Sequence, residues 1–540
     1  MSRDAARDVA MPAPGALTLR QEMDAQARTD PGRVFCAFEG EEITFGALDA
    51  TVNRIANALL AAGLRPGDRV GLMLPGHPDH IACIFALAKI GLVRVPLNTA
   101  LQGPSLAYPF DAFDVQALIA DVAYGEALAP VLAGRALRAV FWRGGEGARS
   151  LAALAAHPDA SPPPFAPAPD DILAITPSSG TTGAPKGVLK SDRTLRAGPM
   201  AILRLTEAES GDTFLFWEAM HHGAGVAVLI AAVLGRLRLG MVARFSASRF
   251  WQQARECGAA RVHYLGSVLP MVLRQPEGPA DRDHGVRIAW GGGCPTEIWA
   301  PFAARFGVEM REGYGLSELI TFCTLNLTGK VGSIGRPLSW FEAMVADAEG
   351  RPLPPGAVGE LCFREREPGL GFLGYFRNDA ASAEAMRDGW FRTGDLARQD
   401  EDGDLFYAGR AKDSIRRRGI NISAWEVERV LLDHTSIEEV ALVGVPSELG
   451  EDEIKIFVRC AEGHRLEPEA LLRWCLPRLP RFQLPRYVAF VEDFPRTPTQ
   501  RIRKAELPRD TAGCWDLEAA APDLLDREPV TGPVTGKDRT

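Results

Sequence analysis

Residues 70–97 read VGLMLPGHPDHIACIFALAKIGLVRVPL. Two apolar runs, Val70–Leu74 and Val93–Leu97, flank a stretch with helical spacing from about Pro78 to Ile90. A strand, a helix and a second strand in this order form a βαβ crossover, which joins parallel neighbours in one sheet. Strand-like runs at Ala117–Ala120 and Ala139–Trp142 repeat the pattern. The stretch therefore predicts an α/β fold built on parallel sheets.

The composition is that of a globular protein. The chain has 540 residues, of which 46% are hydrophobic and 24% are charged, and its formal net charge is −9. These values exclude a mostly disordered chain, and at about 150 residues per domain the length predicts roughly two to four domains. The acidic balance argues against nucleic acid as a partner, while local cationic sites for phosphates stay compatible with it.

The nine cysteines are scattered and form no CxxC pair. We therefore expect reduced thiols in a cytoplasmic protein, with no zinc site and no disulfide framework. The first residues lack the apolar core of a signal peptide. The longest apolar run, Val226–Leu234, is too short to span a bilayer, so no membrane association is expected.

The pattern along the chain predicts two functional units between disordered ends. Residues 1–13 are expected to be disordered, residues 14–411 to form a large N-terminal domain, residues 412–510 to form a small α+β C-terminal domain, and residues 511–540 to form a disordered tail. Within the large domain, strand-like segments dominate from about 331 to 408 and predict a small β-barrel-like subdomain.

The strongest chemical signal is TPSSGTTGAPKG at residues 176–187. It follows the short apolar strand Ile172–Thr176, and we expect a helix after it. Glycines let a backbone turn tightly and present its N–H groups, while hydroxyls and a lysine add donors and charge. The candidate phosphate ligands are Ser178, Ser179, Gly180, Thr181, Thr182, Gly183 and Lys186. The lysine is not placed as in a Walker A loop, and the alternative is a flexible linker.

This segment resembles the phosphate loop of the acyl-adenylate-forming (AMP-binding) enzymes, and further segments match other motifs of that family in order. These segments are Gly313–Glu318 (GYGLSE), Trp390–Asp395 (WFRTGD), Gly409–Asp413 (GRAKD), Arg418–Glu428 (RGINISAWEVE) and Pro495–Thr499 (PRTPT). The resemblance covers about residues 15–510. It implies a mobile C-terminal domain, which would rotate about a hinge at Asp413.

The resemblance also assigns residues to the nucleotide. Tyr314 offers a flat face for adenine, Asp395 can accept from the ribose hydroxyls, and Glu318 is a hard oxygen ligand for Mg²⁺. The remaining nucleotide-binding positions that it implies are Gly292, Gly293, Gly315, Ser317, Arg410, Arg418 and Gly419. Each has a plainer alternative, namely a core tyrosine, a turn aspartate, a surface glutamate, a tight glycine turn or a salt-bridged arginine.

The family chemistry supplies the expected reaction and its catalytic residues. The carboxylate of an acid attacks the α-phosphate of MgATP, pyrophosphate leaves, and the acyl group then passes from acyl-AMP to coenzyme A. The rate of such a reaction depends chiefly on how the reactants are positioned and on how their charges are neutralised. The expected catalytic residues are Lys186, Glu318, Arg501, Asp413 and His222, the last of these beside the acyl pocket.

One position departs from the family pattern. Where the family has a Thr-Gly-Lys-Ile run, this chain has Thr499-Gln-Arg-Ile502, so Arg501 occupies the position of the adenylation lysine. A planar guanidinium does not reproduce the geometry of an ammonium group. We expect Arg501 to replace the lysine; the alternative is weak or absent adenylation. Lys504 lies nearby but is expected on the opposite face.

The acid is the least constrained part of the prediction. The C-terminal half looks most like the carnitine- and crotonobetaine-CoA ligase branch. Trp217, Glu218, Trp290 and Trp340 lie in or beside segments that line the family's pocket, and aromatic faces with a carboxylate would suit a betaine-like acid. Core packing of these tryptophans is the alternative. Arg416–Arg418 could meet the phosphates of coenzyme A, or could be a solvated basic face.

Two rival functions stay open. The first is a stand-alone adenylating enzyme that loads a carrier protein or forms an amide, because the chain contains no carrier domain. The second, motivated by Arg501, is a catalytically impaired nucleotide-binding homologue. The resemblance also leaves a homodimer open.

Overall fold

The computed structural model describes residues 8–178, 184–266, 268–410, 415–417, 420–422, 424–447, 450–495, 502 and 504–526. The chain divides into two compact units. The first holds most of the chain up to Lys412, and the main part of the second begins at Asp413.

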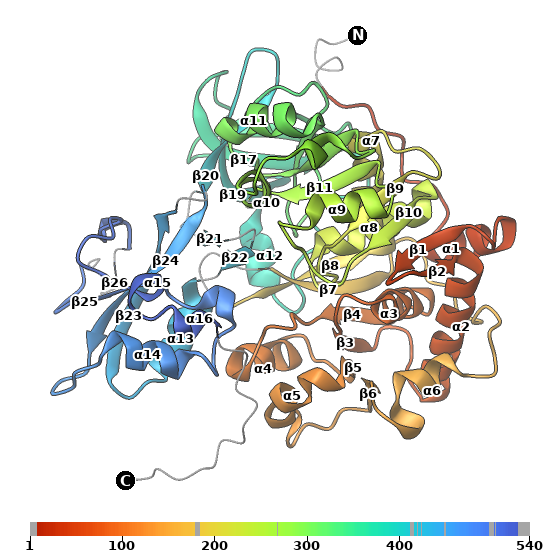
Figure 1. Ribbon diagram of the computed structural model, residues 1–540, viewed down its shortest axis with the longest axis horizontal. Helices are drawn as coiled ribbons and strands as arrows, with labels where there is room; N and C mark the ends of the chain where they lie inside the picture. Colours follow the sequence, from red (N-terminus) through yellow and green to blue (C-terminus); the bar gives the residue numbers. More distant parts are fainter. Residues whose placement is uncertain are drawn as a thin grey trace. The chain divides into compact units, whose positions relative to one another are not determined.

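The βαβ stretch that opens the sequence lies in a six-stranded sheet of the first unit (Figure 1). In the described residues its strand order is β6 (Ala139–Arg143), β5 (Ala117–Asp121), β3 (Arg69–Met73), β4 (Val93–Pro96), β7 (Ile172–Ser178) and β8 (Lys186–Ser191). Strands β3 and β4 are parallel, with Val70 opposite Arg94, as the crossover requires. Only β8 runs antiparallel to its neighbour, β7.

A second, larger sheet also belongs to the first unit, and its strands share one apolar core with those of the six-stranded sheet. Its described order is β15 (Arg336–Pro337), β14 (Thr324–Asn326), β13 (Glu309–Tyr314), β12 (Ile288–Gly292), β11 (Arg261–Leu265), β9 (Thr213–Phe216), β10 (Arg238–Met241), β1 (Val34–Phe38) and β2 (Glu41–Thr44). The strands from β13 to β1 are parallel, and antiparallel strands close both edges.

The helices of the first unit cover these sheets. Their described bounds are α1 Leu19–Thr29, α2 Phe45–Ala61, α3 Pro78–Lys89, α4 Gly103–Ala112, α5 Gly125–Leu132, α6 Leu151–Ala155, α7 Asp192–Thr206, α8 Gly223–Gly235, α9 Phe250–Glu256, α10 Val268–Leu273, α11 Thr296–Phe306 and α12 Asp379–Ala385. One large apolar core takes side chains from both sheets and from α2, α3, α7 and α8. The apolar run Val226–Leu234 is part of α8 and lies in this core. Because both sheets share this core, the ends of their strands are held in fixed positions relative to one another.

The expected barrel-like subdomain is a small antiparallel half-barrel sheet. Its described strands are β16 (Phe341–Ala346), β17 (Val358–Glu365), β19 (Trp390–Gln399), β18 (Met386–Arg387) and β20 (Leu405–Arg410). Strand β19 is central, and its residue Asp395 lies opposite Arg410 of β20. Two expected motifs thus meet in one strand pair.

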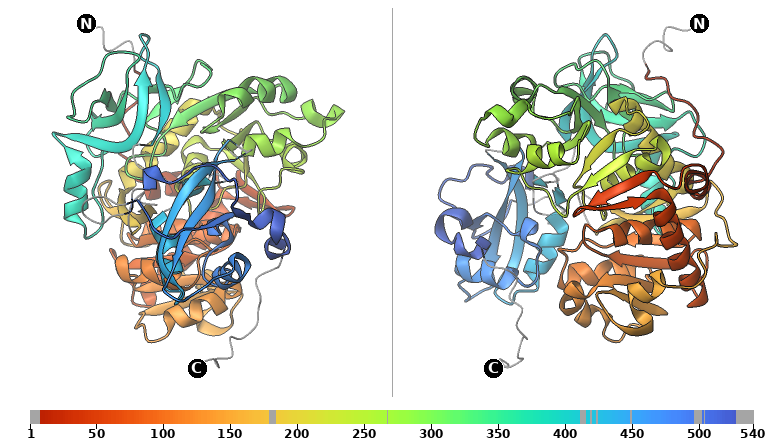
Figure 2. Two further views of the ribbon diagram at one scale, coloured as in Figure 1. Left: turned by 90° about the vertical axis from the view of Figure 1, so that its left-hand side faces the viewer. Right: turned by 45° about the vertical axis from the view of Figure 1, so that its right-hand side comes forward.

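The second unit, drawn in blue in Figure 2, is a small α+β domain. Its described elements are β21 (Ile415–Arg417), β22 (Ile420–Ile422), α13 (Ala424–Leu432), β23 (Ile437–Pro446), β24 (Asp452–Cys460), α14 (Pro468–Cys475), β25 (Tyr487–Phe490), β26 (Trp515–Asp516), α15 (Leu517–Ala520) and α16 (Asp523–Asp526). Strands β23–β26 form one sheet, with its own apolar core.

The two ranges that were expected to be disordered, residues 1–13 and 511–540, were both too long. Val9 exchanges backbone hydrogen bonds with Pro337 and Ser339, so the described residues 8–13 are attached to the first unit. Residues 511–526 are ordered as well, because Trp515 pairs with Val488 and Leu517 is buried in the core of the second unit. Sparse apolar residues hid these short elements from a periodicity search. Residues 1–7 and 527–540 lie outside the described residues.

Helix α3 carries buried charges and a buried imidazole. At its end, the Lys89 ammonium is fully buried and contacts the carboxylates of Asp24 and Asp49, and it donates to Asn53 Oδ1 at 2.9 Å. Near its start, His80 is 2% exposed, and its Nδ1 lies 3.2 Å from the carbonyl oxygen of Pro75. Burial lowers the pKa of His80 to about 3.

Lys89→Met should lower the free energy of unfolding by about 3–5 kcal/mol, because it leaves two packed carboxylates without their shared cation. Urea unfolding followed by tryptophan fluorescence measures the change. Arg28→Met, on the exposed face of α1, is the matched control. A loss below about 1 kcal/mol for Lys89→Met would contradict the assignment of this buried ion pair.

The second prediction concerns acid stability and His80. The unfolded chain binds a proton at His80 below its ordinary pKa of 6.5, whereas the folded protein does not until about pH 3. Stability therefore falls as the pH falls through this window. His80→Gln should flatten the loss of unfolding free energy between pH 7 and pH 5 relative to His464→Gln, an exposed histidine. Identical slopes for the two variants would refute the account.

Candidate active site

The glycine-rich segment 176–187 connects two strands rather than a strand and a helix. Ser178, the last residue of β7, lies opposite Lys186, the first residue of β8. The expected helix is wrong at this point: α7 begins only at Asp192, after β8. A helix dipole therefore cannot contribute at the loop, and its cationic charge has to come from side chains. Ser179, Gly180, Thr181, Thr182 and Gly183 lie outside the described residues.

The two described ends of the loop carry an unused hydroxyl and a positioned ammonium. Ser178 is 7% exposed, and in the described part of the chain its Oγ has no hydrogen-bond partner. Lys186 Nζ lies 4.7 Å from the ring centroid of Tyr375. Tyr375 is held there because the segment around it pairs with β8, with Phe376 N donating to Gly187 O at 2.7 Å.

Tyr375 also connects Lys186 to Glu318. Its hydroxyl donates to Glu318 Oε1 at 3.2 Å, and burial together with this carboxylate raises the pKa of Tyr375. Lys186 and Glu318, which sequence reasoning assigned to phosphate and metal, are thus brought to the same tyrosine. Tyr375 itself was missed, because nothing in its sequence spacing distinguishes it from a core aromatic residue.

A second lysine on β8 lies beside the same carboxylate. Lys190 is 8% exposed, and its Nζ donates to the carbonyl oxygen of Leu319, the neighbour of Glu318. Burial lowers the pKa of Lys190 to about 8, and the Glu318 charge opposes this shift. Alternation along a strand places Lys186 and Lys190 on one face. The spacing of four residues within a strand could have indicated from the sequence that Lys190 lies beside Lys186.

Tyr314 and Asp395, both of which we expect to contact the nucleotide, are in contact with each other. The Tyr314 hydroxyl donates to Asp395 Oδ2 at 2.6 Å, and Asp395 is 4% exposed. Burial and the adjacent carboxylate raise the pKa of Tyr314. Arg410 lies opposite Asp395 in the next strand, although its side chain is outside the described atoms. Strand β13 supplies the tyrosine and β19 the aspartate, so two sheets contribute to this pair.

The glycines near Tyr314 are required by the protein's own backbone. A Cβ at Gly315 would lie 2.1 Å from the carbonyl oxygen of Thr321, and one at Gly292 would lie 3.1 Å from that of Gly313. Gly293 has φ +77°, a left-handed conformation that favours glycine, and its N–H donates to Glu312 Oε1 at 2.7 Å. Internal packing is thus enough to require a glycine at position 315, whether or not a nucleotide lies against it.

The histidine pair marks the start of α8. His222 immediately precedes the helix and is exposed, and its ring centroid lies 4.4 Å from that of His221. Desolvation by the surrounding protein lowers the pKa of both histidines, and the charges of His222, His80 and Arg94 add to the shift at His221. Ser317 is exposed and lies in the turn that carries Glu318.

The aromatic surface expected for a betaine-like acid does not form. Trp290 and Trp340 are 1% and 2% exposed and belong to the main core. Glu218 is buried and paired with His263, whose Nδ1 lies 3.0 Å from Glu218 Oε1. Trp217 Nε1 donates to the His263 backbone at 3.2 Å. Trp290 lies at a buried position of β12 and Trp340 in the buried turn before β16, and the carboxylate of Glu218 is already engaged.

Several expected residues of the second unit lie outside the described residues, namely Asp413, Arg418, Gly419 and Arg501. Two neighbours are described and are engaged elsewhere. Lys504 Nζ lies 2.6 Å from Glu428 Oε1, and Arg417 Nε lies 2.7 Å from Glu453 Oε2. Arg417 is thus a buried ion-pair partner and not the exposed phosphate contact that the basic run suggested.

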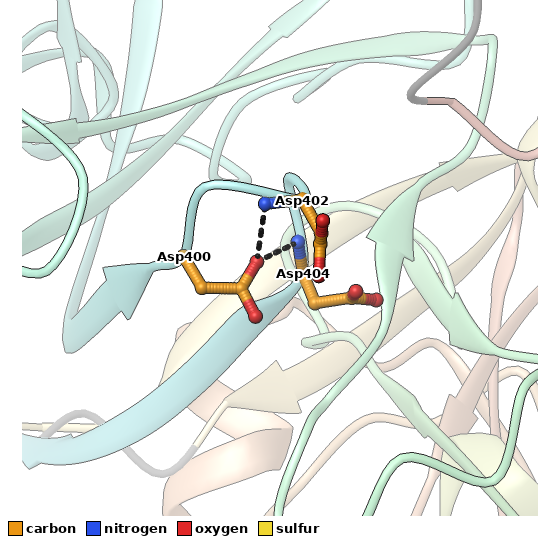
Figure 3. A group of neighbouring side chains, drawn as sticks. All are labelled: Asp400, Asp402 and Asp404. Carbon is orange, nitrogen blue, oxygen red and sulfur yellow. Dashed lines mark hydrogen bonds between the residues drawn. The ribbon is translucent and has the colours of Figure 1, made fainter.

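An acidic turn between β19 and β20 resembles a cation site at first sight (Figure 3). Asp400 Oδ1 accepts from the backbone N–H groups of Asp402 and Asp404 at 3.1 and 2.9 Å. The ammonium of Lys330 lies 2.5 Å from Asp400 and 3.2 Å from Asp404. The lysine already supplies the positive charge, so the turn is an internal ion-pair network.

None of the helices in the described part of the chain is both long and apolar enough to cross a bilayer.

Comparison with known proteins identifies the family. The AMP-binding enzyme family matches residues 23–376, and the AMP-binding enzyme C-terminal domain matches residues 426–501. A sulfoacetate–CoA ligase of Cupriavidus necator is 32% identical over 476 residues, which covers 87% of this chain and 92% of the relative. A crotonobetaine/carnitine–CoA ligase of Salmonella arizonae is 30% identical over 493 residues, with coverages of 87% and 94%.

Solved structures agree on the fold. The amide bond synthetase McbA from Marinactinospora thermotolerans is 26% identical with a TM-score of 0.80, covering 91% of this chain and 99% of the other. The o-succinylbenzoate CoA synthetase from Bacillus subtilis has the same TM-score at 21% identity, covering 91% and 98%. The chain therefore belongs to the AMP-binding enzyme family and is an acid–thiol ligase of its acyl-CoA synthetase type.

Proposed function

We propose that this acid–thiol ligase activates its carboxylic acid as an acyl-AMP and then passes the acyl group to coenzyme A. The observation that carries the proposal is the meeting of Lys186 and Glu318 at Tyr375, next to the unpartnered hydroxyl of Ser178. A hydroxyl without a partner in the described residues and a cation thus lie at the two ends of one loop, and the tyrosine beside the cation binds a hard anionic ligand. ATP and coenzyme A are the co-substrates.

The proposed reaction has two balanced steps. A carboxylate oxygen of the acid forms a bond to the α-phosphorus of ATP, and the bond to pyrophosphate breaks. The thiol of coenzyme A then attacks the acyl carbon, loses its proton, and AMP leaves with one oxygen of the acid. Both steps bring anions together, so positioned cations such as Lys186 lower the barrier by neutralising charge.

The residues present fit a magnesium ion. The Glu318 carboxylate is a hard oxygen ligand that accepts a hydrogen bond from Tyr375 at Oε1, and magnesium typically takes its other ligands from phosphates and water. When bound, the ion would neutralise phosphate charge. Lys190 keeps the Glu318 turn in place through the Leu319 carbonyl group, which fixes the carboxylate in the absence of the ion.

The nucleoside would be held by Tyr314, Asp395 and Arg410. The Tyr314 hydroxyl orients the buried Asp395 carboxylate, which would accept a hydrogen bond from a ribose hydroxyl. Gly292, Gly293, Gly315 and Ser317 complete the expected contact surface. Asp413 would be the hinge, and Arg418 and Gly419 would follow it in the mobile domain.

Arg501 is proposed to replace the usual adenylation lysine. The alternative donor, Lys504, is tied to Glu428 of α13, whose carboxylate also accepts from Leu442 N at 2.5 Å. A lysine paired with a carboxylate that is itself held in the fold is poorly suited to orient a substrate carboxylate. Arg501 is therefore the better candidate.

The acceptor can be tested against its rival. An amide bond synthetase shares the fold at 26% identity, so transfer to an amine is the second candidate. Acyl-CoA formed together with AMP and pyrophosphate supports the ligase. Accumulation of acyl-AMP in the presence of coenzyme A supports carrier loading or amide formation, and nucleotide binding without turnover supports an impaired homologue.

We propose a cytoplasmic location on two grounds. First, the nine cysteines are free thiols, and five of them are buried in the first unit. Second, the co-substrates ATP and coenzyme A are abundant in the cytoplasm. The two relatives do not define one class of acid substrate, because the sulfoacetate and carnitine in their names carry distal groups of opposite charge.

Tyr314→Phe should raise the KM for ATP about tenfold, because it removes the donor that orients a buried carboxylate. Initial rates of pyrophosphate release at varied ATP measure this. Tyr124→Phe, on a short helix after β5 of the other sheet, is the matched control. An unchanged KM for ATP would remove the Tyr314–Asp395 pair from nucleotide binding.

Arg501→Ala should reduce acid-dependent ATP–pyrophosphate exchange by about 100-fold or more, because it removes the charge that orients the carboxylate. Lys504→Ala is the control and should retain most of the exchange. Undiminished exchange in Arg501→Ala, or a loss confined to Lys504→Ala, would exclude the proposed role.

A further inference from the structure

The inference concerns Arg94, a buried arginine in β4 that the proposed reaction does not use. Its backbone lies between Val70 of β3 and Ala174 of β7, in the interior of the six-stranded sheet. The residue is 5% exposed, and its Nη1 atom is buried without a hydrogen-bond partner. Among the described residues the guanidinium has neither a hydrogen-bond partner nor an ion-pair partner.

Other buried arginines of the protein are partnered. Arg196 pairs with Asp192, Arg261 with Asp212, Arg311 with Glu309 and Arg417 with Glu453. Arg20 pairs with Asp24 and donates to two backbone carbonyl groups. Arg94 therefore differs from every other arginine that the structure describes as buried.

The neighbours of Arg94 are basic or neutral. Its charge lowers the pKa of His80 and of His221, so both imidazoles lie within electrostatic reach of the guanidinium. His221 in turn lies against His222, at the start of α8. No carboxylate in the described ranges forms an ion pair with any of these four side chains.

A buried guanidinium without a counter-ion is costly, because desolvation is not repaid by Coulomb attraction. Burial lowers the pKa of Arg94 only to about 10, so the group stays charged at neutral pH. The charge therefore needs an anion from outside the chain. His222 is exposed and lies against His221, so this pair indicates where such an anion would enter.

We propose that Arg94 binds a second anionic group of the acid substrate, so that the substrate is a dianion with a sulfonate or a carboxylate at the end distal to the reacting carboxylate. The proposal rests on the proposed acid–CoA ligase function and names its substrate class. The neutral imidazoles of His221 and His222 can donate to the same group. A betaine-like acid would present its cation to Arg94 and be rejected.

The test compares acids that differ only in distal charge. The pairs are malonate with its monoamide and sulfoacetate with sulfamoylacetate, in which the charged oxygen is replaced by an amide nitrogen. For the wild-type protein, pyrophosphate release should give a kcat/KM about 100-fold higher for at least one dianion than for its uncharged partner. The pair with the larger ratio distinguishes carboxylate from sulfonate.

Arg94→Met should reduce that ratio by about 100-fold, and Arg94→Lys should restore part of it, because the lysine keeps the charge without the fork. Arg138→Met removes an exposed positive charge next to β6 of the same sheet and should leave the ratio unchanged. A ratio near one in the wild type, or an equal loss for both members of a pair in Arg94→Met, would overturn the proposal.

Calorimetric binding of the same acids to the full-length protein separates this inference from the reaction. If no acid yields pyrophosphate, the proposed reaction fails. In that case, binding of malonate or sulfoacetate that is lost in Arg94→Met still supports the anion site, and binding that is the same in both proteins rejects it.

Discussion

Repulsion between anions is the constraint on which the site depends. A carboxylate has to approach the phosphates of ATP, and the chain itself carries a net charge of −9. Attraction must therefore come from cations fixed at particular points. Lys186 and Lys190 share one face of β8, and Tyr375 and the Leu319 carbonyl group hold their ammonium groups beside the Glu318 turn. In the proposed function, the β7–β8 hairpin would supply the positive charge that a helix N-terminus supplies in other phosphate loops.

The buried cations of the first unit fall into two kinds. Lys89 is fully surrounded by its own carboxylates and amide, so it stabilises the packing of α1, α2 and α3. Lys190 and Arg94 have no such ion-pair partners within the described residues, and burial lowers the pKa of both. Charges of the second kind reduce the stability of the isolated fold. We infer that they are retained because the ligands supply the missing negative charge.

Sequence reasoning predicted those features that depend on local pattern. The crossover at residues 70–97 and the separate C-terminal unit follow from periodicity and from motif resemblance, which also singled out Tyr314 and Asp395. It failed where tertiary packing decides. A hairpin instead of a helix after the phosphate loop, the burial of Trp290 and the ordered residues 511–526 depend on contacts between segments distant in sequence. Arg94 could not be recognised from the sequence either, because what distinguishes it is that its buried guanidinium has no counter-ion among the described residues.

The central claim, that the acid is activated as an acyl-AMP, can be tested most directly by isotope transfer. The acid is labelled with heavy oxygen in its reacting carboxylate and incubated with the protein, ATP, magnesium and coenzyme A. Mass spectrometry then locates the label among the products. The account predicts one labelled oxygen in AMP for each acyl-CoA formed. Label in inorganic phosphate, or AMP without label, would contradict it.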